Sequence, residues 1–273
     1  MNLVELRKND HLSASAVNEY LSCSLAFKFG RIDRILPEFT ADALEFGKAI
    51  HRALEDFHTE KMRGTYLSVK QLQECFENHW RRIIAARDDI KYAEGNDADI
   101  LLLQGKELLT AYVNKAPIHD YECIAVEEAF SFNIEGCPLP IIGAIDLVEI
   151  DSSGTIIITD FKTSARAYSF DEVERNFQLT LYQMAMKANG HDGADILLRF
   201  DCLLKKKSPS FESYYTTRSV TDEIRAKKKI VTVAKGIAKG IFIPNDDFMN
   251  WRCKGCIFKK RCDSWYLGEE VAA

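Results

Sequence analysis

The spacing of apolar residues changes near Pro117, from a helical period to a strand period. In the first 118 residues, apolar positions recur every three or four residues, which predicts helices. These helices are expected at about residues 16–29, 44–62, 69–87 and 98–114. Ser13 and Ser15 are candidate N-caps for the first helix, and Pro117 ends the helical portion.

After Pro117 the pattern predicts β-strands, because short β-branched runs are bounded by turn residues such as Glu135-Gly136 and Ser153-Gly154. Strands are expected at 121–134, 139–150, 155–162, 194–205 and 210–218. One helix should cover 170–188, and another should run to about residue 239 from a cap at Thr221 or Asp222. The order predicts an α/β fold with a mixed central sheet flanked by helices, in a single domain spanning 1–273. Its parts are a helical portion at 1–118, a core sheet at 119–218, and a helix with a cysteine-rich tail at 219–273.

Composition is that of an ordinary globular protein, with 273 residues of which 47% are hydrophobic and 28% charged. No apolar run approaches the length of a membrane span, and the N-terminus lacks an apolar signal region. We therefore expect a cytoplasmic protein that does not contact a membrane. In that compartment the eight cysteines are expected to be thiols or metal ligands rather than disulfides.

The net charge of −5 is unevenly distributed. From Lys205 onward the chain has 15 Lys and Arg against eight Asp and Glu, a net charge of +7, so the remainder carries −12. A basic C-terminal third indicates a local phosphate-binding surface, although a solvated helix face would give the same pattern. The candidate contacts for single-stranded DNA are two lysine runs, Lys205, Lys206, Lys207 and Lys227, Lys228, Lys229.

Three charged residues mark two neighbouring strands. Asp160 and Lys162 end the buried run at 156–163 and point to the same side of the strand, because side chains alternate. Asp146 lies on the strand before. A simple ion pair at the strand edge would explain Asp160 and Lys162 alone. All three together suit hydrolysis of a phosphodiester, in which acids hold a hard cation and the lysine offsets phosphate charge.

The C-terminal tail carries Cys253, Cys256 and Cys262 in a C-x2-C-x5-C pattern typical of metal ligands. A fourth ligand is needed, and Cys23, near a helix end, is the best candidate. Cys75 lies in a helical apolar pattern, and Cys123, Cys137 and Cys202 fall in the strand section, so all four read as small buried residues. Spacing alone leaves both zinc and an iron–sulfur cluster open, and either centre would mainly close a very long loop.

Six motifs in this order resemble the PD-(D/E)XK nuclease superfamily, in particular its RecB-like branch with an iron–sulfur cluster. That branch includes the AddB nuclease domain and the CRISPR-associated exonucleases of the Cas four family. The motifs are the opening segment ending in Cys23, Gly47-Lys48-Ala49-Ile50-His51, Gly143-Ala144-Ile145-Asp146, Asp160-Phe161-Lys162-Thr163, Gln178-Leu179-Thr180-Leu181-Tyr182, and the cysteine tail. The first acid lacks the preceding proline of the superfamily's name, and the second is Asp rather than Glu. No motif covers about residues 69–114.

The resemblance implies a restriction-endonuclease-like core and a set of residue roles. His51, Asp146, Asp160 and the carbonyl of Phe161 would bind Mg²⁺ or Mn²⁺. Lys162 would orient water or stabilise the transition state, with Gln178 and Tyr182 at the mouth of the site. Glu127 or Glu128 could join it, but the sequence does not say which side chain points inward. Cys23, Cys253, Cys256 and Cys262 would hold a [4Fe-4S] cluster.

The function expected from these features is a metal-dependent DNA exonuclease that acts on single-stranded DNA or DNA ends in recombination, repair or CRISPR spacer acquisition. One alternative is a nuclease-like subunit that is active only within a helicase or CRISPR integrase complex. Another is a zinc-bound nucleic-acid-binding protein without catalysis.

Overall fold

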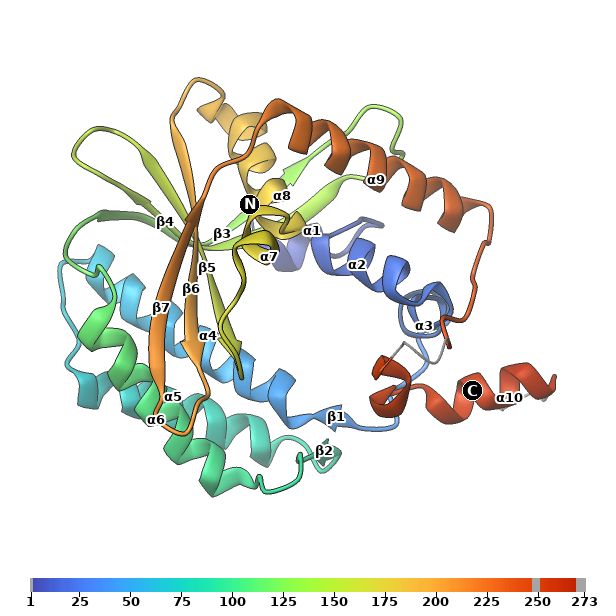
Figure 1. The fold of residues 1–273 in the computed structure, drawn as a ribbon, viewed down its shortest axis with the longest axis horizontal. Helices are drawn as coiled ribbons and strands as arrows, with labels where there is room; N and C mark the ends of the chain where they lie inside the picture. The colour runs from blue at the N-terminus through green and yellow to red at the C-terminus, as the bar shows by residue number, and fades with distance from the viewer. Residues whose placement is uncertain (1, 247–250, 269–273) are drawn as a thin grey trace.

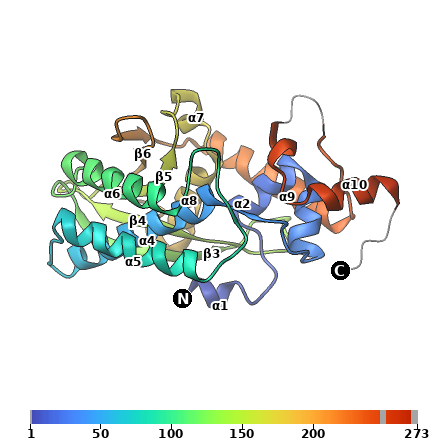
Figure 2. The ribbon, with the colours of Figure 1, turned by 90° about the horizontal axis from the view of Figure 1, so that it is seen from below.

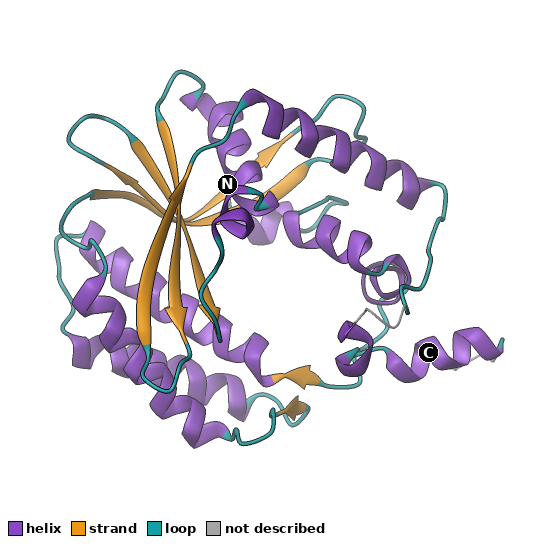
Figure 3. Ribbon diagram, viewed as in Figure 1, coloured by secondary structure: helices purple, strands orange, loops and turns teal. Residues whose placement is uncertain are grey.

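A twisted five-stranded sheet forms the centre of the computed structural model, which describes residues 2–246 and 251–268 (Figures 1 and 3). The strands are β3 (Glu122–Phe132), β4 (Ile141–Ile150), β5 (Ile156–Ser164), β6 (Ile196–Leu204) and β7 (Ser210–Thr216), in that spatial order. β5 and β6 are parallel, and the other neighbouring pairs are antiparallel. The parallel pair needs a crossover, which two helices supply. The predicted α/β class with a mixed, helix-flanked sheet is confirmed.

One face of the sheet is covered by three helices, α4 (Asp42–Met62), α5 (Val69–Ala85) and α6 (Ala98–Lys115). Their apolar faces meet Leu147, Phe161 and Leu203 of the sheet in one buried cluster. At the centre of this layer, Phe76 crosses α6 at Gly105, where an added Cβ would lie 2.1 Å from its ring. This packing is close enough that the glycine is required.

The opposite face is covered by α2 (Ala14–Ser22), α8 (Phe177–Met186) and α9 (Val220–Ala238) (Figure 2). They form a second cluster with Ile145, Ile158 and Phe200 of the strands. The segment before α2 adds to the sheet, because the Leu12 amide donates to the Pro140 carbonyl and the Ile142 amide donates to the Leu12 carbonyl. The chain start is thereby attached to β4, one of the strands that carries predicted site residues.

The helix between β5 and β6 differs from the prediction of one continuous element at 170–188. It is divided into α7 (Phe170–Glu174) and α8, followed by a π-helical turn at Lys187–His191. The break occurs because Asn176 has an extended backbone and its side chain accepts from the Leu179 amide, capping a new helix. α8 can therefore take its own direction across the sheet.

Caps also correct the limits of two other helices. Ser13, and not Ser15, caps α2, and the extended backbone of Cys23 ends that helix before α3 (Ser24–Phe27) and a π-helical turn at Lys28–Ile32. Ser219 caps α9 in a capping box with Asp222, so neither Thr221 nor Asp222 is the cap. Local hydrogen bonding of a serine side chain decides where α2 and α9 begin.

Short elements that the pattern did not predict complete the fold. These are α1 (Leu3–Leu6) and a two-stranded parallel pair, β1 (Thr40–Ala41) with β2 (Ile90–Lys91). A 3₁₀ turn at Trp251–Gly255 and α10 (Lys259–Leu267) bring the C-terminal part against α3, where Phe258 packs on Leu25 and Phe29. None of the helices in the described part of the chain has the length and apolar character that a membrane span requires.

Candidate active site and cysteine-lined cavity

The site begins where β4 and β5 separate. Their antiparallel pairing ends at Leu147 and Thr159, one residue before Asp146 and Asp160 would meet. Beyond that point the Asp146 side chain connects the two strands in place of main-chain pairing. Its Oδ2 accepts a hydrogen bond from the Phe161 amide over 2.8 Å. The strand ends are thus held apart by a side chain, which leaves both acids at the fork.

Asp160 and Lys162 form an ion pair at this fork, with 2.6 Å between Nζ and Oδ2. Gln178 of α8 accepts from Lys162 Nζ over 3.1 Å and donates to the Tyr182 hydroxyl over 2.7 Å. The Tyr182 hydroxyl donates to Asp160 Oδ1 over 3.2 Å. Asp160 is 1% exposed, so the Tyr182 hydroxyl at Oδ1 and the Lys162 ammonium at Oδ2 take the place of water around its carboxylate.

His51 reaches the same fork from α4. Its Nδ1 lies 3.4 Å from Asp146 Oδ2, and its ring stands edge-on to Phe161. One ligand atom each from His51, Glu127 and Asp146 lie within 4.8 Å of one another, a separation suited to sharing one metal ion. Glu127 is therefore the inward acid of its pair, and Glu128 is exposed.

Crowding of carboxylates dominates the electrostatics. Burial, and next the charge of Asp160, raise the pKa of Asp146 to about 8. Burial, and then the charge of Asp146, raise the pKa of Glu127 to about 7. Burial lowers the pKa of His51, so the imidazole is neutral and able to coordinate a cation near neutral pH. The pKa of Lys162, which burial lowers, is raised overall by Asp160, so the amine is protonated.

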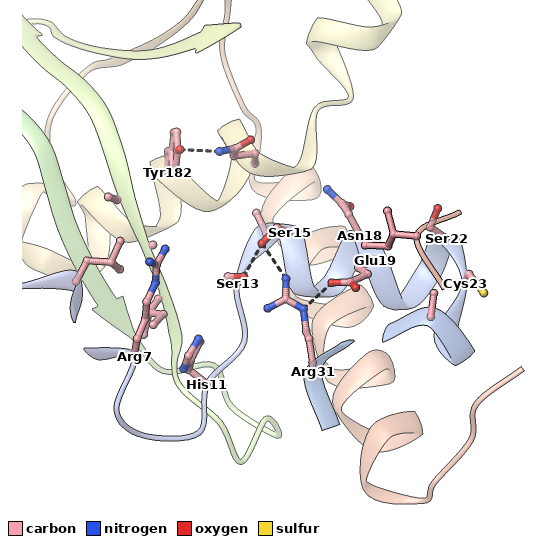
Figure 4. A pocket seen from close by; sticks show the side chains of 18 of the residues that line it. Arg7, His11, Ser13, Ser15, Asn18, Glu19, Ser22, Cys23, Arg31 and Tyr182 are labelled. Carbon is pink, nitrogen blue, oxygen red and sulfur yellow. Dashed lines mark hydrogen bonds and ion pairs between the residues drawn. The ribbon is translucent and has the colours of Figure 1, made fainter. Parts of the chain in front are cut away.

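Asp146 and Glu127 line a cleft of about 1090 Å³, part of which is shown in Figure 4. The N-terminal segment, α2 and the π-helical turn at Lys28–Ile32 supply its other wall, with the polar side chains Arg7, His11, Ser13, Ser15, Asn18, Glu19 and Arg31. Arg31 donates to Glu19 over 2.6 Å and to Ser15 over 3.4 Å. The residue pattern did not predict this wall, because its residues become neighbours of Asp146 only through the pairing of Leu12 with β4.

The four predicted cluster cysteines line a single smaller cavity of about 190 Å³. Cys23 comes from the end of α2, and Cys253, Cys256 and Cys262 come from the C-terminal part. Cys23, Cys253 and Cys256 also line the large cleft, so the cavity adjoins it. Of the remaining cysteines, Cys123 and Cys202 are buried in strands as expected, and Cys137 lies in the loop between β3 and β4 rather than in a strand.

The predicted lysine contacts lie away from the cleft. None of the six is among its lining residues. Lys205 lies over the Phe46 ring, Lys206 pairs with Glu212 over 3.1 Å, and Lys229 lies over the Phe177 ring. Lys207, Lys227 and Lys228 are exposed.

A solved structure from Eubacterium rectale, described as a candidate exonuclease, has a similar fold. Its TM-score is 0.58 at 10% sequence identity, and the match covers 93% of this chain and 91% of the other. A second structure, of the protein SSO0001, matches 91% of this chain and 96% of its own at 16% identity, with a TM-score of 0.39. No curated protein matches the chain. The sequence profile of the PD-(D/E)XK nuclease superfamily matches residues 11–263, nearly the whole chain, and with the acid–acid–lysine fork in place the protein belongs to that superfamily.

Proposed function

We propose that this protein is a divalent-metal-dependent DNA exonuclease that acts on single-stranded DNA or on DNA ends. The observation that carries the proposal is the fork itself, where Asp146, Asp160 and Lys162 gather beside His51 at the edge of a large cleft. A strand-edge ion pair would not need a histidine and a second acid from other elements.

The donors present fit a hard divalent cation. Carboxylate oxygens suit Mn²⁺ and Mg²⁺, and the neutral imidazole of His51 adds one nitrogen donor. His51, Asp146 and Asp160 would hold the ion, with the Phe161 carbonyl as a further ligand. Such an ion polarises a phosphate and lowers the pKa of a bound water.

Lys162 is the group of this chain best placed to act on the scissile phosphate. Its ammonium is protonated and is held by Asp160 and Gln178, so it can offset charge that develops on the phosphate oxygens. In hydrolysis, a water oxygen bonds to phosphorus, the phosphorus–oxygen bond to one sugar breaks, and that sugar oxygen takes a proton. Tyr182 and Gln178 position the pair formed by Asp160 and Lys162.

The cleft is the expected path of the substrate. Arg7 and the short polar side chains of α2 face it, and such donors contact phosphates without reading bases. The lysine runs at 205–207 and 227–229 lie outside the cleft and would act as distant contacts, for a strand that continues beyond it. A flexible single strand suits such a bent path.

A [4Fe-4S] cluster is the group that we propose for the cysteine-lined cavity. Thiolates that share one Zn²⁺ at about 2.3 Å lie roughly 4 Å apart. Within residues 2–246 and 251–268, no three cysteine Sγ atoms lie within 4.8 Å of one another. A larger group at the centre fits this spacing better, and it would join the chain start to the C-terminal part.

The nuclease is tested by degradation of end-labelled single-stranded DNA with Mg²⁺ or Mn²⁺, using wild type, Lys162→Ala and Asp160→Ala. We expect metal-dependent cleavage by wild type and at least a 100-fold loss in both variants. Folded wild-type protein that leaves DNA intact would overturn the stand-alone enzyme and favour a subunit that needs a helicase or integrase partner.

The iron–sulfur proposal is tested by colour and metal content of protein purified without oxygen. Wild type should be brown and contain about four iron atoms per chain, and Cys262→Ser should lose most of both. Cys202→Ser is the matched control, because Cys202 is fully buried in β6, away from the cavity. Colourless wild-type protein with one equivalent of zinc would instead favour the zinc-bound alternative.

A further inference from the structure

A separate pocket lies between α8 and α9, which pack side by side (Figure 1). Its volume is about 390 Å³, in the range of sites that hold small molecules. Three basic side chains line it, Arg175, Arg225 and Lys229. We propose that this α8–α9 pocket binds a phosphate group, carried by a nucleic-acid strand or by a free nucleotide. The strand as the source rests on the function proposed above.

Helical spacing brings the α9 side chains to the pocket. Asp222, Arg225 and Lys229 follow one another at intervals of three and four residues, so they share one face of the helix. Of the lysine run at 227–229, only Lys229 is among the lining residues. Arg175 reaches the same space from the end of α7. Residues from two parts of the chain thus place their cations around one space.

These cations have few counter-charges of their own. The Lys229 Nζ lies 4.8 Å from the centroid of the Phe177 ring, a cation–π contact. Within the described part of the chain, neither Lys229 nor Arg175 forms an ion pair. Arg225 has a loose one, with 3.6 Å between its Nη1 and Asp222 Oδ1. All three basic side chains are exposed, so they can turn toward an entering anion.

A buried arginine adds positive charge behind the pocket. Arg218 is 8% exposed, and it makes five hydrogen bonds, one for each N–H of its guanidinium. All the acceptors are neutral hydroxyl or carbonyl oxygens, so no carboxylate offsets the charge by direct contact. One acceptor, the Thr180 hydroxyl, belongs to a residue that lines the pocket. Buried charge without compensation is costly, and an anion in the pocket would reduce that cost.

The two acids of the pocket are already engaged by hydrogen bonds. Glu174 accepts from the Thr216 hydroxyl over 2.6 Å, and Asp222 accepts from the amide and hydroxyl of Ser219 over 2.9 and 2.7 Å. The three basic side chains contribute +3 and the two acids −2, so the lining carries +1, and Arg218 raises this to +2. A phosphate carries between one and about two negative charges, which matches this balance.

The pocket shares the first turn of α8 with the candidate active site. Gln178, which contacts Lys162 in the fork, directly follows Phe177, which lines the pocket. Consecutive residues of a helix point about 100° apart around its axis, so the two sites lie on neighbouring sides of one helix end. The pocket is therefore placed to hold a phosphate of a strand whose other part lies in the cleft. Such a contact positions the strand without reading its bases.

The test is binding of a fluorescent single strand of about 30 nucleotides to the full chain without metal, so that no cleavage intervenes. Wild type is compared with the pocket variant Arg175→Gln/Lys229→Gln and with the control Arg82→Gln/Lys115→Gln. The control loses the same residue types and the same charge at exposed positions of α5 and α6, on the other face of the sheet.

The expected effect follows from counterion release. Each phosphate contact on a single strand contributes about 0.7 to the slope of log affinity against log salt, so the pocket variant should lower that slope by about 1.4. At about 50 mM salt, the pocket variant should bind the strand at least tenfold more weakly than wild type, and the control should change binding by less than about twofold.

A calorimetric titration with deoxyadenosine 5′-monophosphate identifies the source of the phosphate. Weaker strand binding by the pocket variant assigns the pocket to the strand. Loss of nucleotide binding with unchanged strand affinity assigns it to a free nucleotide.

Unchanged affinity of the pocket variant for both probes would overturn the proposal, and so would equal weakening by the control. The melting temperatures of both variants should match that of wild type, because the substituted side chains are exposed. Wild type that binds the strand through the pocket but never cleaves DNA would overturn the nuclease and leave the pocket standing.

Discussion

Asp146 Oδ2 accepts a hydrogen bond from the Phe161 amide, with 2.8 Å between the two atoms. A side chain thereby continues the connection between β4 and β5 after their main-chain pairing has ended at Leu147 and Thr159. The same carboxylate lies 3.4 Å from His51 Nδ1. One acid therefore fixes the backbone of the D-x-K strand and faces the expected cation.

Replacing Asp146 by Asn should separate these two tasks. The Asn carbonyl oxygen can still accept from Phe161, so the variant should fold, whereas metal-dependent cleavage should fall at least 100-fold.

Without metal, the raised pKa of Asp146, about 8, means that the folded chain holds a proton that the unfolded chain releases near pH 4. The contribution of Asp146 to stability should therefore fall as pH rises from about 4 to 8.

Urea unfolding of metal-free protein at pH 5 and pH 8.5 checks this sign. The free energy of unfolding of Asp146→Asn, relative to that of wild type, should be higher at pH 8.5 than at pH 5. The same difference between variant and wild type at both pH values would contradict the prediction.

His58 predicts a pH dependence of the opposite sign. It is buried under Phe161, its Nε2 lies 2.6 Å from the Tyr112 hydroxyl, and its Nδ1 has no hydrogen-bond partner. Burial lowers its pKa well below the usual value, so folding keeps the ring neutral while the unfolded chain takes up a proton below about pH 6.5. The His58 contribution to stability should therefore decline as pH falls from about 6.5.

The measurement is again urea unfolding, of wild type and His58→Gln at pH 7.5 and pH 5. The variant should be less stable than wild type at pH 7.5, and the gap should narrow at pH 5. His79, which pairs with Asp56 near the surface, offers the control substitution His79→Gln, for which we expect no such narrowing.

Gly143 should not tolerate a side chain. A Cβ at this position would lie 2.5 Å from Cζ of Phe130, which crosses the glycine on the neighbouring strand. Gly143→Ala should therefore cost about 1–3 kcal/mol of unfolding free energy, the usual range for overpacking. Adding Phe130→Leu should recover part of that loss, and a double variant no more stable than expected from additivity would contradict the clash.

A buried ionic network on the helical side predicts a larger loss. Glu149 accepts from Lys61 over 2.9 Å and from Arg199 over 2.7 Å, and all three side chains are at most 5% exposed. Glu149→Gln leaves Lys61 without a carboxylate partner and Arg199 with Asp201 alone, which should cost about 3–5 kcal/mol. Chemical denaturation measures it, and Glu5→Gln, in an exposed pair with Lys8, should change stability by less than about 1 kcal/mol.

The sequence by itself determined the central sheet and the pairing of Asp160 with Lys162 at the fork. Five strands were predictable from β-branched runs, and strand alternation was enough to place Asp160 and Lys162 on one side, because both signals are local. The C-x2-C-x5-C spacing of Cys253, Cys256 and Cys262 was also visible in the sequence. In contrast, the break at Asn176 depended on a competition between continuing a helix and starting a new one, which short-range propensity does not decide.

Only the tertiary structure decided which acid of β3 points inward and what faces it. Glu127 and Glu128 are equivalent in the sequence, and the left-handed backbone of Glu127 distinguishes them through packing on both faces of the sheet. The cleft wall from Arg7 to Arg31 arises from a pairing between Leu12 and Ile141, more than 100 residues apart. The salt bridge of Glu149 with Arg199 is equally non-local. A residue pattern records the period of each element, whereas the neighbours of a side chain follow from how whole elements pack.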